Sequence, residues 1–163
     1  MTKNRIVVTL PSDTEIHQTR VFEAPRDLVY KAMTDPDLVP KWWGLRSNTT
    51  RVDAMDLRPG GKWRFVQTDK QGNEHAFRGE YSEIVPNERT VATFEYEPLA
   101  GHICEENTTF EDLGDNRTRV TTLSKFSSKE DRDGMLQSGM EEGANESWDR
   151  ADELLAELQE AKA

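Results

Sequence analysis

The sequence predicts an α+β domain in which an antiparallel sheet curves around a long helix near the carboxyl end. Three observations lead to this prediction. Residues 21–44 have the pattern of a strand end followed by two short helices, and residues 48–126 form apolar–polar segments separated by turn sequences. Residues 127–158 carry an apolar stripe at steps of three and four, which is typical of an amphipathic helix.

The two short helices should follow the first strand, residues 14–22. Pro25 suits a first helical position, where its missing N–H costs nothing. Asp35-Pro36 should end the first helix, because the residue before a proline is pushed out of the helical region, and Pro36 can start the second. Adjacent helical residues point about 100° apart, so we expect only one of Trp42 and Trp43 to be buried. The apolar residues at helical spacing are Leu28, Val29, Ala32 and Met33.

Seven strands are predicted, and all but the first are joined by hairpin turns. Residues 1–11 either fray or contribute an additional strand over 5–10. We therefore expect an N-terminal extension over 1–12 and a single domain over 13–161. The predicted strands are 14–22, 48–57, 62–68, 75–85, 90–97, 102–112 and 117–126.

The last helix is predicted to run from a cap at Ser127-Ser128 to about Leu158, with Glu130 and Asp131 in its first turn. Its apolar stripe is bulky at both ends and small in the middle. A glycine in a helix interior costs about 1 kcal/mol relative to alanine, so the three glycines here indicate that space matters. The stripe is Leu136, Met140, Gly143, Ser147, Ala151, Leu154 and Leu158, and the glycines are Gly134, Gly139 and Gly143.

The small middle of this helix predicts a cavity between helix and sheet. Large inward strand residues would wall it, and an apolar pocket with a few polar groups is the usual form of a small-molecule site. The alternative is a filled core, in which the aromatic rings pack directly against the helix glycines. The predicted ligand-binding residues are Trp43, Trp63, Phe65, Phe77, Tyr81, Phe94, Tyr96, His102, Met140, Gly143 and Ser147.

No catalytic residue can be assigned from the sequence. The three histidines lie on separate predicted strands without metal-ligand spacing, so we expect neither a metal nor a cofactor. His102 and Cys104 could form a nucleophilic pair, although a buried thiol is the favoured interpretation. A carboxylate in an apolar pocket would have a raised pKa and could act as a general acid; the strand candidates are Glu23, Asp56, Glu95 and Glu106.

Composition indicates one soluble domain, with 34% hydrophobic and 32% charged residues in a chain of 163. The net charge of −10 argues against nucleic acids and anionic membranes as partners. No apolar run is long enough to span a bilayer, and no signal-peptide pattern is present, so we expect a cytoplasmic protein. Cys104 is the single cysteine, which excludes an internal disulfide. The sequence does not decide whether the protein forms a homodimer.

The segment Phe-Glu-Ala-Pro-Arg-Asp-Leu-Val-Tyr-Lys-Ala-Met-Thr-Asp-Pro-Asp-Leu-Val-Pro-Lys-Trp-Trp-Gly, residues 22–44, resembles the opening of the activator of heat-shock protein 90 ATPase homologue family. Residues 57–63, 77–81, 86–89 and 148–158 also match, so the resemblance covers about 14–160. That family belongs to the START-like, birch-pollen-allergen-like helix-grip superfamily, which includes polyketide cyclases and dehydrases. The resemblance implies a helix-grip fold that binds a small hydrophobic or aromatic molecule, with or without cyclase- or dehydratase-like chemistry. The alternative function is a protein-interaction module, like the helix-grip domain of a chaperone ATPase activator.

Overall fold

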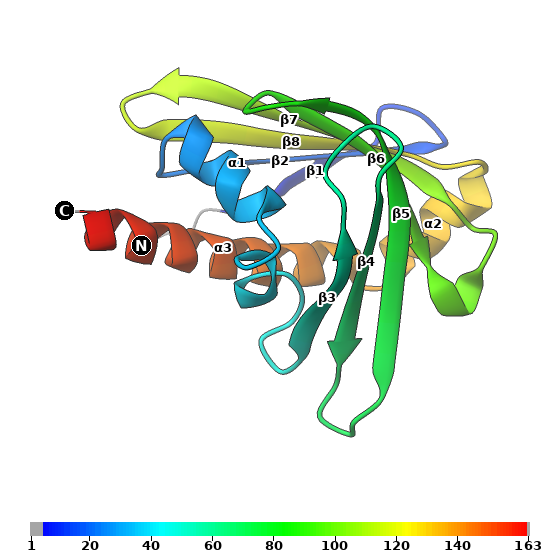
Figure 1. The fold of residues 1–163 in the computed structure, drawn as a ribbon. Helices are drawn as coiled ribbons and strands as arrows, with labels where there is room; N and C mark the ends of the chain where they lie inside the picture. The colour runs from blue at the N-terminus through cyan, green and yellow to red at the C-terminus, as the bar shows by residue number, and fades with distance from the viewer. Residues whose placement is uncertain (1–4, 163) are drawn as a thin grey trace.

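The computed structural model describes residues 5–162, in which one antiparallel sheet curves around a carboxy-terminal helix (Figure 1). The predicted α+β class is confirmed. The spatial order of the strands is β1-β2-β8-β7-β6-β5-β4-β3. Their bounds are β1 Val7–Thr9, β2 Glu15–Phe22, β3 Thr49–Met55, β4 Lys62–Thr68, β5 Glu74–Val85, β6 Arg89–Tyr96, β7 Cys104–Gly114 and β8 Arg117–Lys125.

The sheet has eight strands over these residues, so the prediction of seven was wrong. The additional strand, β1, pairs antiparallel with β2 at the edge of the sheet, with Val7 opposite Thr19. Ile6, just before β1, is buried, and its N–H donates to Oδ1 of Asn145 at 2.8 Å. This contact with the last helix holds β1 in place. The predicted boundary at residue 12 stays a prediction, and residues 1–4 of that extension lie outside the described residues.

The helical elements are α1 Arg26–Thr34, η1 Val39–Lys41, η2 Glu97–Leu99, α2 Lys129–Gln137 and α3 Met140–Lys162. The first short helix is confirmed as α1, and it ends before Asp35 as expected. The second is a single 3-10 turn, η1, with Pro40 in its first turn. None of the helices within residues 5–162 combines the length and apolar character needed to cross a membrane.

The predicted continuous last helix is wrong, because the chain breaks between α2 and α3. Gly139 has φ +86, a backbone conformation that side-chain-bearing residues rarely adopt. This glycine is therefore explained by the bend in the chain, whereas the prediction had assigned it to the cavity. The predicted cap is confirmed, since the Ser128 hydroxyl accepts a hydrogen bond from the Asp131 N–H at 3.1 Å.

One half of the space between sheet and helices is closely packed. Here α1 and the carboxyl half of α3 cover β2, β7 and β8 (Figure 1). The rings of Phe22 and Trp148 meet edge to face with centroids 5.6 Å apart. We call this region the closed core; its buried members include Phe22, Val29, Val120, Ala151 and Leu155.

A buried arginine joins β2 to α3 at the border of the closed core. The Arg20 guanidinium donates to Asp149 and to Asp152, each at 2.8 Å. The Arg20 side chain is 1% exposed, so its charge is neutralised by these two carboxylates away from most solvent. Burial raises the pKa of Asp152, and the charge of Arg20 opposes this shift.

Candidate functional site

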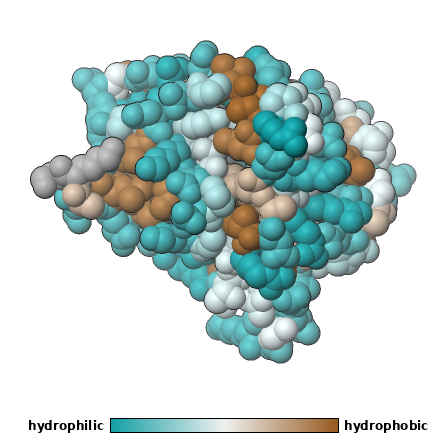
Figure 2. All heavy atoms as spheres, in the orientation of Figure 1, coloured by the Kyte–Doolittle hydropathy of each residue, from teal (hydrophilic) through white to brown (hydrophobic). Residues whose placement is uncertain are grey.

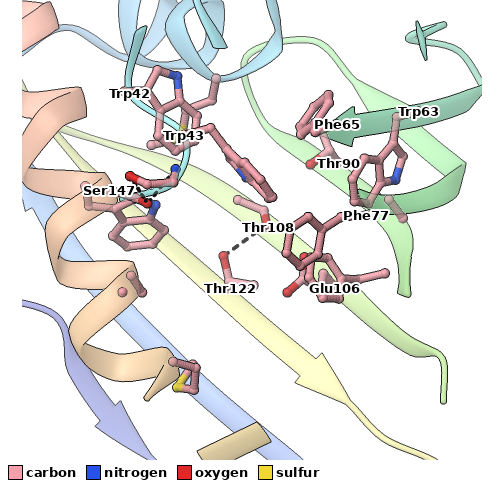
Figure 3. Close-up of a pocket in the computed structure, with 18 of the residues that line it drawn as sticks. Trp42, Trp43, Trp63, Phe65, Phe77, Thr90, Glu106, Thr108, Thr122 and Ser147 are labelled. Carbon is pink, nitrogen blue, oxygen red and sulfur yellow. Dashed lines mark hydrogen bonds between the residues drawn. The ribbon is translucent and has the colours of Figure 1, made fainter. Parts of the chain in front are cut away.

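A cavity of about 390 Å³ lies between the concave face of the sheet and the amino half of α3 (Figure 3). Its lining comes from both the strands and the helices, together with the loop that carries Trp43 and Gly44. In the view of Figure 2, hydrophobic side chains reach the surface in a narrow interrupted band between the region of α1 and the β3–β5 hairpins. The predicted cavity is therefore present in the structure, and it is next to the closed core.

Five aromatic side chains form one wall of the cavity, which we call the aromatic wall. Trp43 meets the rings of Phe65 and Phe77 edge to face, with centroids 5.2 Å and 5.1 Å away. The other members extend this network across β4, β5 and β6, with centroid separations of 4.8–5.9 Å. Such contacts hold the rings in fixed relative positions. The aromatic wall consists of Trp43, Trp63, Phe65, Phe77 and Phe94.

Gly79 makes room for one of these rings. The Trp63 Nε1–H donates to the Thr93 carbonyl at 3.2 Å, and the indole passes directly over Gly79. A Cβ on Gly79 would lie 2.4 Å from Trp63 Nε1 and 1.9 Å from the Thr93 oxygen. Any side chain there would displace the ring or the strand.

The two tryptophans of residues 42 and 43 differ as predicted. Trp42 is 6% exposed and belongs to the closed core, and its Nε1–H donates to the Ala32 carbonyl at 2.8 Å. Trp43 is half-buried and contacts both the closed core and the other rings of the aromatic wall. Trp42 thus anchors the loop, while Trp43 presents its ring to the cavity (Figure 3).

Next to the aromatic wall, the sheet presents polar side chains, which we call the polar floor. Strand pairing places Gln18 beside Thr122, Thr122 beside Thr108, and Thr108 beside Thr90, so one polar row crosses β2, β8, β7 and β6. The hydroxyls of Thr108 and Thr122 are hydrogen-bonded at 3.0 Å. The polar floor consists of Gln18, Thr90, Glu106, Thr108 and Thr122.

Glu106 is the carboxylate that sequence reasoning could not select. Glu23 and Asp56 are exposed, and Glu95 is held outside the cavity by Arg78 at 2.9 Å and the Gly101 N–H at 2.7 Å. Glu106 instead points into the cavity, where Ser124 Oγ donates to it at 3.5 Å (Figure 3). Burial raises its pKa to about 7, and the serine hydrogen bond opposes the shift only in part.

Gln18 is a site residue that sequence reasoning missed. It is 8% exposed, and its Oε1 is buried without a hydrogen-bond partner. A buried amide oxygen without a partner is unusual in proteins and costs free energy. The available signal was the alternation of β2, in which Ile16, Gln18, Arg20 and Phe22 all face inward.

On the helix side, a Cβ built on Gly143 meets no atom within 4 Å, so this glycine borders open space. Ser147 also lines the cavity, but its hydroxyl is already engaged with Gly44. It accepts from the Gly44 N–H at 2.9 Å and donates to the Gly44 carbonyl at 3.1 Å. Arg150 donates to the same carbonyl at 3.0 Å and to the Lys41 carbonyl at 3.0 Å. These bonds fasten the 41–45 loop to α3.

Two predicted ligand-binding residues do not line the cavity. Tyr96 ends β6, where its hydroxyl bonds His75 Nδ1 at 3.0 Å. His102 precedes β7, and its side chain is 60% exposed with Nδ1 2.9 Å from Asp131. The other nine line it: Trp43, Trp63, Phe65, Phe77, Tyr81, Phe94, Met140, Gly143 and Ser147.

The thiol of Cys104 is buried at 3% exposure, and burial raises its pKa. His102 points to Asp131, away from any role as its base. This arrangement favours the buried-thiol interpretation over a Cys–His pair. In the part of the chain that the structure describes, no three His, Cys, Asp or Glu side chains are grouped closely enough to hold a metal ion.

Comparison with solved structures shows the same fold in several proteins. A solution structure from Arthrobacter aurescens matches with TM-score 0.84 and 24% identity, over 93% of this chain and 91% of that one. A crystal structure from Rhodobacter sphaeroides matches with TM-score 0.87 and 22% identity, over 93% and 98%. DynU16, from the dynemicin biosynthetic locus, matches with TM-score 0.68 and 22% identity, over 90% of this chain and 48% of its own.

Comparison with curated proteins gives no match. The model of the family described as "Activator of Hsp90 ATPase homolog 1-like protein" matches residues 23–156, which is most of the chain. The protein therefore belongs to this family, and its sheet and carboxy-terminal helix have the helix-grip arrangement of the START-like superfamily.

Proposed function

We propose that this protein binds a small hydrophobic or aromatic molecule in the cavity between the curved sheet and α3. The observation that carries the proposal is the open space between the aromatic wall and Gly143. At about 390 Å³ the cavity has the size of ordinary small-molecule sites, and its mixture of rings with a few polar groups is typical of them.

The filled-core alternative would place sheet side chains against the helix glycines. No atom lies within 4 Å of a Cβ built on Gly143, which argues against a filled core. The protein-interaction function depended on such a filled core with an exposed apolar patch, so the cavity favours ligand binding. The occurrence of the same fold in a protein of the dynemicin biosynthetic locus is compatible with a small-molecule role.

Cyclase- or dehydratase-like chemistry would need a group in the cavity that transfers a proton. Glu106 fits this requirement, because a carboxyl with a pKa of about 7 exchanges its proton readily near neutral pH. Binding comes first in the proposal, and proton transfer by Glu106 would be a second step.

The test uses N-phenylnaphthylamine, an uncharged apolar dye that fluoresces when it leaves water. The wild type should bind it. Gly143→Leu should weaken binding by about tenfold, because the leucine occupies the open space. Gly143→Ala is the matched control, since it gains the same helix propensity with little volume, and Gly134→Leu places the same side chain on the exposed face of α2.

Thermal melts of the same variants distinguish a cavity from a filled core. In a cavity, Gly143→Leu keeps or gains stability, since replacing a helix glycine contributes about 1 kcal/mol. In a filled core it overpacks and loses about 1–3 kcal/mol. A destabilised variant, together with a wild type that binds no dye, would overturn the proposal.

A further inference from the structure

Glu106 is the sole charged side chain lining the cavity within residues 5–162. The other titratable lining residue is Tyr81, whose pKa is raised by burial. The other residues around Glu106 carry no charge. They are Cys104 and Thr108 on β7, Thr122 and Ser124 on β8, Ala92 and Thr90 on β6, Ile16 and Gln18 on β2, and Met135 and Met140 on the helices. The carboxylate therefore faces the cavity without a cationic partner.

The hydrogen-bonding capacity of Glu106 is also largely unused. A carboxylate can accept about four hydrogen bonds. The structure gives Glu106 one from a side chain, that of Ser124 at 3.5 Å, which is at the long limit for such a bond. A charged group in these surroundings is costly unless something compensates it.

A second, independent feature of the polar floor also calls for a donor. The Gln18 side chain lines the same cavity, and its Oε1 is buried without a hydrogen-bond partner. It comes from β2, two strands away from Glu106 on β7. The floor thus holds two acceptors whose hydrogen-bonding capacity is not filled.

The aromatic wall adjoins the polar floor, and Phe77 and Trp43 project toward the floor (Figure 3). Aromatic faces attract cations as well as apolar groups. An organic cation is the kind of molecule that this combination would bind. The combination consists of a carboxylate, an unpartnered amide oxygen and several rings around one space. A hydroxyl group would satisfy the acceptors but would not neutralise the carboxylate.

We propose that the ligand class is an aromatic or apolar molecule carrying a protonated amine, with the amine bound by Glu106 and the apolar body against the aromatic wall. This inference rests on the proposed function.

The test compares three probes of the same shape by isothermal titration calorimetry at about pH 8, where Glu106 is mostly ionised. The probes are naphthylethylamine, naphthylethanol and naphthylacetate. The wild type should bind the amine about tenfold more tightly than the alcohol, and the acetate most weakly. Glu106→Gln should remove the preference for the amine over the alcohol.

Glu105→Gln is the matched control, because Glu105 is exposed on the opposite face of β7 and its substitution changes the net charge equally. It should keep the amine preference. Equal affinity of the wild type for all three probes would overturn the amine inference and leave the proposed function standing. If none of the three binds, the inference fails, and the uncharged dye decides the proposed function separately.

Discussion

The two halves of α3 are one continuous helix, yet they meet the sheet in different ways. In the carboxyl half, Ala151 and Leu155 are 0% and 1% exposed and pack into the closed core. In the amino half, Met140, Gly143 and Ser147 are half-buried and border the cavity. The sheet changes with the helix, from Phe22 and Val120 under the carboxyl half to Gln18 and Thr122 in the cavity. The packed core and the cavity thus lie on successive turns of one helix.

Truncating the two adjacent tryptophans should give the largest difference between the two regions. Trp42→Ala should cost about 3–5 kcal/mol, since it removes a buried ring of the closed core together with its bond to Ala32. Trp43→Ala should cost about 1–2 kcal/mol and weaken dye binding, because it removes ring contacts of the aromatic wall. Urea denaturation and dye titration measure both effects. Equal stability losses would contradict the division between anchor and cavity.

A second pair of substitutions tests α3 itself. Leu155→Ala should destabilise the fold by about 3 kcal/mol, because it opens a void in the closed core. Met140→Ala should cost about 1 kcal/mol or less, because the methionine already borders open space. Thermal unfolding followed by circular dichroism measures both changes. If Met140→Ala costs as much as Leu155→Ala, the amino half of α3 is packed like the carboxyl half.

The last comparison concerns Glu106, whose effect on stability should depend on pH. Its folded-state pKa of about 7 lies above the ordinary value of 4.5, so between these values the folded protein holds a proton that the unfolded chain has lost. The free energy of unfolding should therefore fall as pH rises through this window. Glu106→Gln removes the effect and should be more stable than the wild type by about 1–3 kcal/mol near pH 8, with little difference near pH 4.

Glu105→Gln serves again as the control and should follow the wild-type profile. Parallel wild-type and Glu106→Gln profiles would mean that solvent hydrates the Glu106 carboxylate, and the cavity would then be open to bulk water at that point.

The sequence was sufficient for the fold class because most of its signals are local. Alternating residues mark the strands, and Asp35-Pro36 and Ser128 mark helix ends. The break at Gly139 was missed because a glycine that creates space and a glycine with positive φ look the same in a sequence. The weak pattern of residues 5–10 left β1 undecided, since its place depends on pairing with β2 and on the distant Asn145.

The candidate site was only partly predictable, for a related reason. Alternation placed rings such as Trp63 and Phe77 in the cavity lining, but it gave no sign of where the lining ends, so the prediction also included Tyr96 and His102, which do not line the cavity. Choosing Glu106 among four carboxylates required knowing which strands lie side by side. Gln18 was missed because a polar residue in a strand is ordinarily expected to face water.

The ion pairs of Arg20 also have a consequence for how α3 is oriented about its own axis. Asp149 and Asp152 are three residues apart, and both must face β2 to reach the one guanidinium. Because successive helical residues are about 100° apart, a rotation of α3 by one position would break both pairs and would turn Glu142 or Ala144 toward the place of Gly143. The arginine on β2 therefore fixes the rotation of the helix about its axis, and this rotation determines which helix side chains line the cavity.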